Sequence, residues 1–210
     1  MKKSTKALLL VLCAMLLVGV SVMGTVAYLT SNQSVSNTFS VGQVNITLEE
    51  TKVDEYGVAL TGAAAGTTDA GQAYKMLPGH EYVKDPTITV TQGSEPCWLF
   101  VKVENGVAAY EADTNTIASQ LAANGWKLLE EGGDVYYHAV VDARTAAQPV
   151  DVFETLVIAD NADTVSGWSD VTSENTKVIV TAYAIQADGF NDPDKTEAQN
   201  VAAALSALNP

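Results

Sequence analysis

The chain has few of the residues that form disulfides or hold transition metals. Its 210 residues include two cysteines and two histidines. Cys13 lies in an apolar run near the N-terminus, which leaves Cys97 as the only thiol in the rest of the chain and excludes an internal disulfide there. Cys97 begins the strand-like run CWLFVKV, so we expect a buried, inert thiol, with an intermolecular disulfide or a reactive thiol as the alternative. Core packing must therefore hold the fold together.

Basic residues are also scarce. The chain has 11 Lys and Arg against 25 Asp and Glu. All 25 acidic residues but only 8 of the basic ones follow residue 27, so this part has a formal charge of about −17. Such a surface repels nucleic acids and anionic lipid headgroups. It keeps an exported protein soluble, or it attracts divalent cations or basic partners.

Catalytic motifs are absent from the sequence. His80 is followed by Glu81, but Lys84 stands where a zincin helix needs its second histidine, and His138 lies far along the chain. There is no Gly-x-Ser-x-Gly element and no phosphate loop ending in Gly-Lys-Ser/Thr. We therefore predict a protein that is not an enzyme and that needs no cofactor, with calcium as the one candidate.

The longest apolar run lies close to the N-terminus, at 7–23. Three lysines precede it and the small residues of 24–27 close it, which is the pattern of a secretory signal peptide. We predict a signal helix over 1–27 and cleavage between Ala27 and Tyr28. The rest of the chain then lies outside the cytoplasm, as a secreted protein of the extracellular matrix or cell surface.

The same run leaves an alternative open. Residues 7–26 are close to the ~20 residues that a membrane-spanning helix needs. An uncleaved helix would make the protein a membrane-tethered surface adhesion module. After cleavage, by contrast, no membrane contact is expected.

Short β-type segments dominate the remainder. Several runs alternate apolar and polar residues or are wholly apolar, and turn residues separate them. These runs cover 41–48, 88–90 after Pro86, 97–103, 126–130, 135–141, 150–158 and 177–186. We predict an all-β domain over 44–210, a jelly-roll or immunoglobulin-like β-sandwich.

One or two short helices complete this domain. Ile117 and Leu121 lie four residues apart, with Asp113 or Thr114 as the expected cap and Asn124-Gly125 as the stop. A second amphipathic helix is expected over 196–208. The small, glycine-rich residues 57–73 indicate a mobile loop.

One cluster of oxygen-bearing side chains precedes the last helix. Calcium prefers such ligands. The candidate ligands are Asp188, Asn191, Asp192, Asp194 and Glu197. The alternative is a set of turns, with Asp194 or Thr196 capping the helix.

Four stretches carry a resemblance to a known family. They are Gly24–Thr30, Ser36–Val44, Lys75–Gly79 with Asp85-Pro86, and Thr181–Gly189. Together they resemble the TasA and camelysin family of Gram-positive bacteria. The resemblance implies removal of the signal by a signal peptidase of the SipW type. It also implies a jelly-roll subunit, or accessory, of an extracellular fibre in a biofilm matrix, whose partners are copies of itself or related matrix subunits.

In such fibres the segment exposed by cleavage enters the next subunit as an added strand. The corresponding segment here lies within 28–43, as a leader or donor strand whose expected apolar pegs are Tyr28, Leu29, Val35 and Phe39. Alternatively this strand stays in its own domain or forms a plain leader. Camelysin is described as a metalloendopeptidase, so the resemblance also offers an enzyme, for which this sequence has no histidine pair at ligand spacing.

Overall fold

The computed structural model divides the chain into two units, Met1–Ser40 and Val41–Pro210. The structure describes residues 5–6, 8, 10–17, 43–172 and 175–208. In the first unit the described residues are helical, and within the described parts of the chain no helix is long and apolar enough to cross a membrane. The predicted cleavage site and the four predicted pegs lie outside the described residues.

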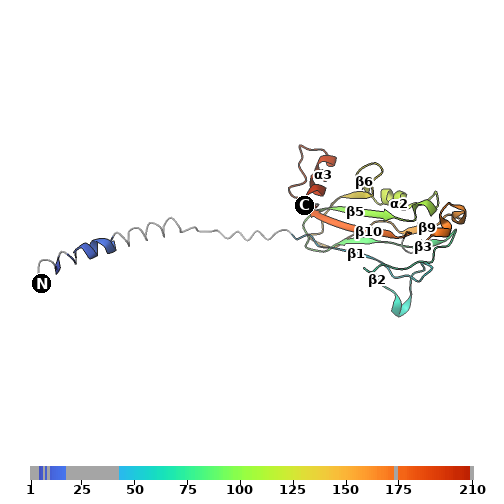
Figure 1. Ribbon diagram of the computed structural model, residues 1–210, viewed down its shortest axis with the longest axis horizontal. Helices are drawn as coiled ribbons and strands as arrows, with labels where there is room; N and C mark the ends of the chain where they lie inside the picture. The colour runs from blue at the N-terminus through green and yellow to red at the C-terminus, as the bar shows by residue number, and fades with distance from the viewer. Residues whose placement is uncertain (1–4, 7, 9, 18–42, 173–174, 209–210) are drawn as a thin grey trace. The chain divides into compact units, whose positions relative to one another are not determined.

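The second unit is rich in β-structure, with three antiparallel sheets in its described part (Figure 1). The first sheet has the order β2 (Thr67–Thr68), β1 (Ile46–Thr51), β4 (Thr87–Val90), β8 (Gln148–Asp151). The second has the order β10 (Val178–Gln186), β5 (Cys97–Asn105), β7 (Val135–Val141), β6 (Lys127–Leu128). The third pairs β3 (Glu81–Val83) with β9 (Thr155–Val157).

Short helices lie between or after these strands. The α-helices are α2 (Ile117–Ala123) and α3 (Glu197–Leu208). Single 3₁₀ turns are η1 (Gly62–Ala64), η2 (Ala108–Tyr110), η3 (Ala162–Thr164) and η4 (Trp168–Asp170). The predicted β-rich class with a few short helices is confirmed.

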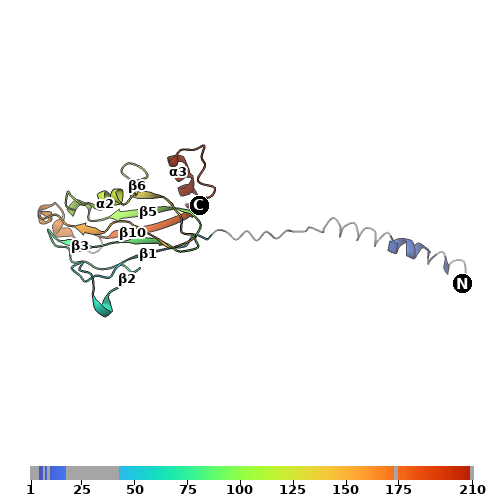
Figure 2. The ribbon, with the colours of Figure 1, turned by 180° about the vertical axis from the view of Figure 1, so that it is seen from behind.

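One hydrophobic cluster joins the two four-stranded sheets. Its buried members include Ile88 and Val90 from β4 and Leu99 and Val101 from β5. The even-numbered residues of β10 pack against it over 178–184. Figures 1 and 2 show β5 and β10 side by side, with β1 below them in both views. Apolar burial between the two sheets is therefore the main stabilising contribution.

A second cluster covers the other face of β5. Trp98 and Phe100 point away from the main cluster and pack with Val201 and Ala204 of α3. Burial on both faces explains why the run CWLFVKV is almost wholly apolar, and this prediction is confirmed. α3 itself begins as predicted, because the Thr196 hydroxyl accepts a hydrogen bond from the N–H of Gln199 at 3.3 Å.

The predicted single strand over 150–158 is wrong. This stretch contains the end of β8 and all of β9, which belong to different sheets. Val152 and Phe153, both fully buried, occupy the crossing. The side-chain oxygen of Gln120 accepts hydrogen bonds from the next two backbone N–H groups. A run that is apolar at most positions looks the same whether it stays in one sheet or changes sheets.

Two turn regions also differ from the prediction. Thr116, not Asp113 or Thr114, caps α2, since its hydroxyl accepts from the N–H of Ser119 at 3.2 Å. The predicted loop 57–73 is partly regular, because β2 pairs with the end of β1. The hairpin predicted from 126–141 is confirmed as β6 paired with β7.

Candidate binding groove beside strand β10

β10 is a nine-residue strand at the edge of its sheet. Hydrogen-bonded and non-hydrogen-bonded positions alternate in an antiparallel pair. The N–H of Gly106 donates to the carbonyl of Lys177, and the N–H of Ala187 donates to a carbonyl just before β5. Odd-numbered residues therefore bond to β5. The backbone groups of the even-numbered residues over 178–184 point the other way, where none of the strands that the structure describes pairs with them.

The edge at β8 is less able to accept a strand. The N–H of Val152 donates to the carbonyl of Pro86, so even-numbered residues bond to β4 and the backbone groups of Pro149 and Asp151 point outward. Pro149 has no N–H to offer, and the carbonyl of Asp151 already accepts from the indole of Trp126 at 2.8 Å. Proline is one of the means by which edge strands avoid unwanted pairing.

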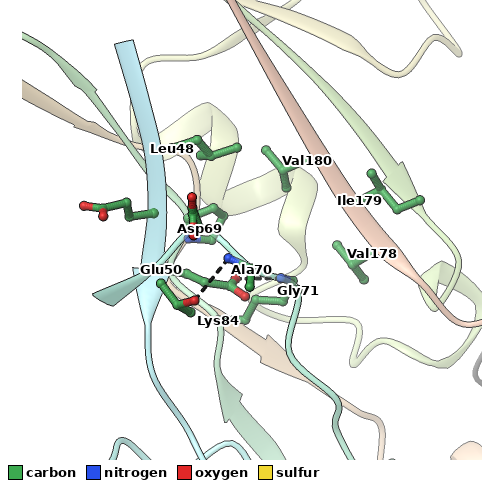
Figure 3. Close-up of a pocket in the computed structure, with 12 residues that line it drawn as sticks. Leu48, Glu50, Asp69, Ala70, Gly71, Lys84, Val178, Ile179 and Val180 are labelled. Atoms are coloured by element: carbon green, nitrogen blue, oxygen red, sulfur yellow. Dashed lines mark hydrogen bonds and ion pairs between the residues drawn. The ribbon is translucent and has the colours of Figure 1, made fainter. Parts of the chain in front are cut away.

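Two adjoining cavities lie beside the open edge of β10. The smaller, about 260 Å³, is lined by Leu48 and Val180 among others (Figure 3). The larger, about 410 Å³, is lined by apolar side chains that include Val107 and Ile158. The lining residues that the two cavities share are Gly71, Lys84, Val178 and Ile179. We call the two cavities together the β10 groove.

A polar cluster lies where the two cavities meet. Lys84 Nζ is 2.7 Å from Glu50 Oε2, and both side chains are only 11% exposed. The amide of Gln72 donates to Glu50 Oε1 at 3.1 Å and to the carbonyl of Thr51 at 2.8 Å. The pair is thus held on the groove floor by a second set of hydrogen bonds, and Figure 3 shows the ion pair itself.

Tyr74 contributes a hydroxyl to the same region, and this buried hydroxyl has no hydrogen-bond partner among the described residues. The tyrosine lines the larger cavity, and its ring meets that of Tyr82 edge-on at 5.8 Å. Burial raises the pKa of this hydroxyl, with a further contribution from the Glu50 and Asp85 carboxylates, so it stays protonated and able to donate. Buried polar atoms are usually paired, which makes this one a candidate ligand contact.

The Lys84–Glu50 pair yields a stability prediction. Lys84→Met leaves the Glu50 carboxylate buried without its cation, so we expect a loss of about 2–3 kcal/mol in the free energy of unfolding, measured by urea titration. The control is Lys102→Met, which removes a half-exposed pair with Glu104 and is expected to leave the midpoint unchanged. Equal midpoints for the two variants would contradict the structural role of the buried pair.

Four of the five predicted calcium ligands lie in the turn before α3, and Glu197 is the first residue of the helix. Asp192 Oδ1 accepts from the N–H of Asp194, and Asp192 Oδ2 lies 3.4 Å from Lys195 Nζ. Glu197 pairs with Lys127 at 2.7 Å. No group of three His, Cys, Asp or Glu side chains suited to a metal is present in the part that the structure describes. Calcium binding therefore remains a prediction, and the turn hydrogen bonds agree with the alternative.

The two histidines lie in separate places. His80 Nε2 is 2.8 Å from the carbonyl of Tyr56, and its ring lies 4.6 Å from that of Tyr82. His138 packs edge-on against Trp126 at 5.2 Å. Each ring thus has a local packing role.

Cys97 is fully buried, as predicted for this thiol. Burial raises the pKa of Cys97 to about 11. Only about one thiol in a thousand is then ionised at pH 8, and the thiolate is the reactive form. We expect iodoacetamide to modify Cys97 in urea but not in the folded chain, as read by mass spectrometry. Rapid modification of the folded protein would favour the reactive-thiol alternative.

The groove residues carried no recognisable signal in the sequence. They are Glu50 of β1, Gln72 and Tyr74 after β2, and Lys84 just after β3. No periodic spacing links them, and only the pairing of β1 with β4 and β2 brings them together. The outward-pointing backbone groups of β10 likewise result from the order of the strands in the sheet.

The site has to be interpreted from its own geometry. No model of a known protein family, no curated protein and no solved structure matches this chain.

Proposed function

We propose that this chain is a secreted structural protein, a subunit of an extracellular fibre that grows by strand addition between copies. Segment 28–41 of one copy pairs with the open edge of β10 in the next copy. The observation that supports this most strongly is the row of outward-pointing backbone groups over 178–184, next to a groove with apolar walls. An added strand satisfies these groups and fills the groove.

The chemistry of segment 28–41 suits this role. It contains no charged residue, whereas the chain from residue 28 onward carries about −17. A neutral strand avoids the repulsion that two acidic surfaces would otherwise produce on contact. Its apolar residues, among them Val35 and Phe39, are few and are separated by Ser, Thr and Asn, so the segment stays soluble until it is placed.

The edge strands give the assembly one direction. β2 and β6 have only two residues each, and Pro149 hinders the pairing of an added strand with β8. Among the edge strands of the two four-stranded sheets in the described part, β10 is the long one with open backbone groups, so we infer one acceptor and one donor per copy. Such a head-to-tail contact does not close on itself and produces a filament.

Two further statements belong to this proposal. The two four-stranded sheets are the halves of a jelly-roll β-sandwich, as the resemblance to the TasA and camelysin family implies. Signal peptidase, acting between Ala27 and Tyr28, frees the donor segment during export, which confines assembly to the outside of the cell.

The test compares the chain 28–210 with the chain 42–210 by sedimentation and electron microscopy. Filaments are expected only from the longer chain, and a synthetic peptide covering 28–41 is expected to slow their growth, with a scrambled peptide as control. Filaments of equal number and width from the chain 42–210, or no filaments from either chain, would overturn the proposal. The second result would favour a surface module that acts as a monomer.

A further inference from the structure

We infer that the strand entering the β10 groove runs antiparallel to β10 and places the side chain of Asn37 against the hydroxyl of Tyr74. This inference rests on the proposed function and deepens it, since it names the register and the polar contact that select the occupant. Three features carry it: the order of chemistry along the groove, the unequal lining of the two cavities, and the Tyr74 hydroxyl, which has no partner among the described residues.

Apolar side chains line both ends of the groove, joined at the smaller cavity by Glu49 and Asp69, and a charged pair lies between the ends. At one end Leu48 and Val180 line the smaller cavity. At the other end Val107 and Ile158 line the larger one. The polar cluster of Lys84 with its partner Glu50 lies at the shared boundary. The β10 side of the groove spans five residues, 176–180.

The donor segment shows the same order on one face. Alternate residues of a strand point to the same side, so Val35, Asn37 and Phe39 share a face. Their side chains are apolar, polar and apolar in turn over five residues, about 13 Å of extended chain. The opposite face over the same stretch carries only Ser36 and Thr38 with Ser at either side. A slip of one residue would place hydroxyl groups, in place of Val35 and Phe39, against the apolar residues of both cavities, which favours this face.

The lining of the two cavities sets the direction. Phe39 suits the larger cavity, which is lined mainly by apolar and aromatic side chains, and Val35 suits the smaller one, whose lining also includes Glu49 and Asp69. Val35 then lies beside Val180 and Phe39 beside Thr176, so the two strands run in opposite directions. Asn37 falls beside Val178, at the polar boundary.

Asn37 provides what the Tyr74 hydroxyl lacks. A protonated hydroxyl donates, and the carboxamide oxygen of an asparagine accepts. The amide N–H₂ can donate in turn to the Glu50 carboxylate, which already lies on this floor. A buried donor without a partner disfavours the filled groove, so an occupant with an apolar residue at this position binds less tightly.

Disulfide trapping tests the direction. Ser36 and Ile179 would face each other on the outer side of the antiparallel pair, and Ile179 is 44% exposed. The double variant Ser36→Cys/Ile179→Cys is expected to give covalent ladders of oxidised filaments on a denaturing gel. Thr38→Cys/Ile179→Cys would be opposite only in the parallel arrangement and is expected to stay monomeric. The reverse result, or ladders from both, would overturn the inference.

Critical concentrations for assembly test the polar contact. We expect Asn37→Ala and Tyr74→Phe each to raise the critical concentration of the chain 28–210 about tenfold. The double variant should have no larger an effect than Asn37→Ala alone, because both changes remove the same hydrogen bond and no donor is left unpaired. Ser36→Ala, on the outer face, is the matched control with less than a twofold effect. Additive effects, or an Asn37→Ala effect equal to the control, would overturn the contact.

The outcomes separate this inference from the proposed function. If removal of residues 28–41 leaves filaments unchanged, the proposed function fails. If that removal abolishes filaments while Asn37→Ala behaves like the control, strand addition stands and the assigned register fails.

Discussion

Proline in place of Val180 is expected to abolish filament formation while the subunit stays folded. The N–H of Val180 points away from β5 and bonds to no described strand, so its loss removes no hydrogen bond within the sheet. In the proposed fibre the same N–H would donate to the added strand, and a proline ring at this position would obstruct that strand. We expect the critical concentration to rise at least about tenfold, equivalent to roughly 1.4 kcal/mol. Sedimentation measures it, and circular dichroism reports the fold.

Two matched variants make this result interpretable. Val180→Ala keeps the N–H and shortens only the side chain, so filaments should persist at a moderately raised concentration. Ile179→Pro removes an N–H that bonds to β5, and we expect its melting temperature to fall clearly below that of the other two variants. Filaments from Val180→Pro at the normal concentration would exclude the β10 edge as the acceptor.

Replacing Gln120 by Ala is expected to have the largest effect on stability, about 3–5 kcal/mol in the free energy of unfolding. Its buried side chain bonds to four backbone groups. The amide oxygen accepts from the N–H groups of Glu154 and Thr155 at 2.9 and 3.0 Å. The amide nitrogen donates to the carbonyls of Asn115 and Thr155 at 3.0 and 2.8 Å. Without it these groups lose their partners where the chain passes from β8 to β9.

Urea titration followed by tryptophan fluorescence measures this effect. The control is Gln199→Ala, because the Gln199 oxygen accepts from the N–H of Thr196 at an exposed helix start, where water replaces it. We also expect Gln120→Ala to weaken filament growth in the same measurements, since β9 and the residue after it contribute Leu156 and Ile158 to the larger cavity. A loss no greater than that of Gln199→Ala would show that water reaches the crossing.

Much of the secondary structure follows from local pattern. The apolar run at 97–103 forms the first seven residues of β5, and all but the first residue of the stretch 177–186 form β10. α3 follows from its cap at Thr196 and its helical spacing. Such features depend on residues that are close in sequence, so a short stretch of sequence is enough to recognise them. The exchange of sheets at Val152 was missed because it depends on contacts with Gln120, more than 30 residues away.

The candidate groove depends on long-range contacts. Its polar floor is made by Glu50, Gln72 and Lys84, and a short sequence window contains only one of them at a time. The unpaired hydroxyl of Tyr74 can be recognised only when its surroundings are known. The small side chains and glycines of 57–73 indicate a mobile loop, yet β2 within this stretch extends the first sheet beside the groove.

The sequence alone determined the β-rich class, the burial of Cys97, the strong negative charge and the predicted export signal, because each depends on composition or on short-range order. Tertiary structure decided which strand lies at an open edge, which edge Pro149 blunts and where two cavities meet a buried ion pair. These properties depend on the order of strands in space. Long-range backbone pairing sets that order, and no local pattern specifies it.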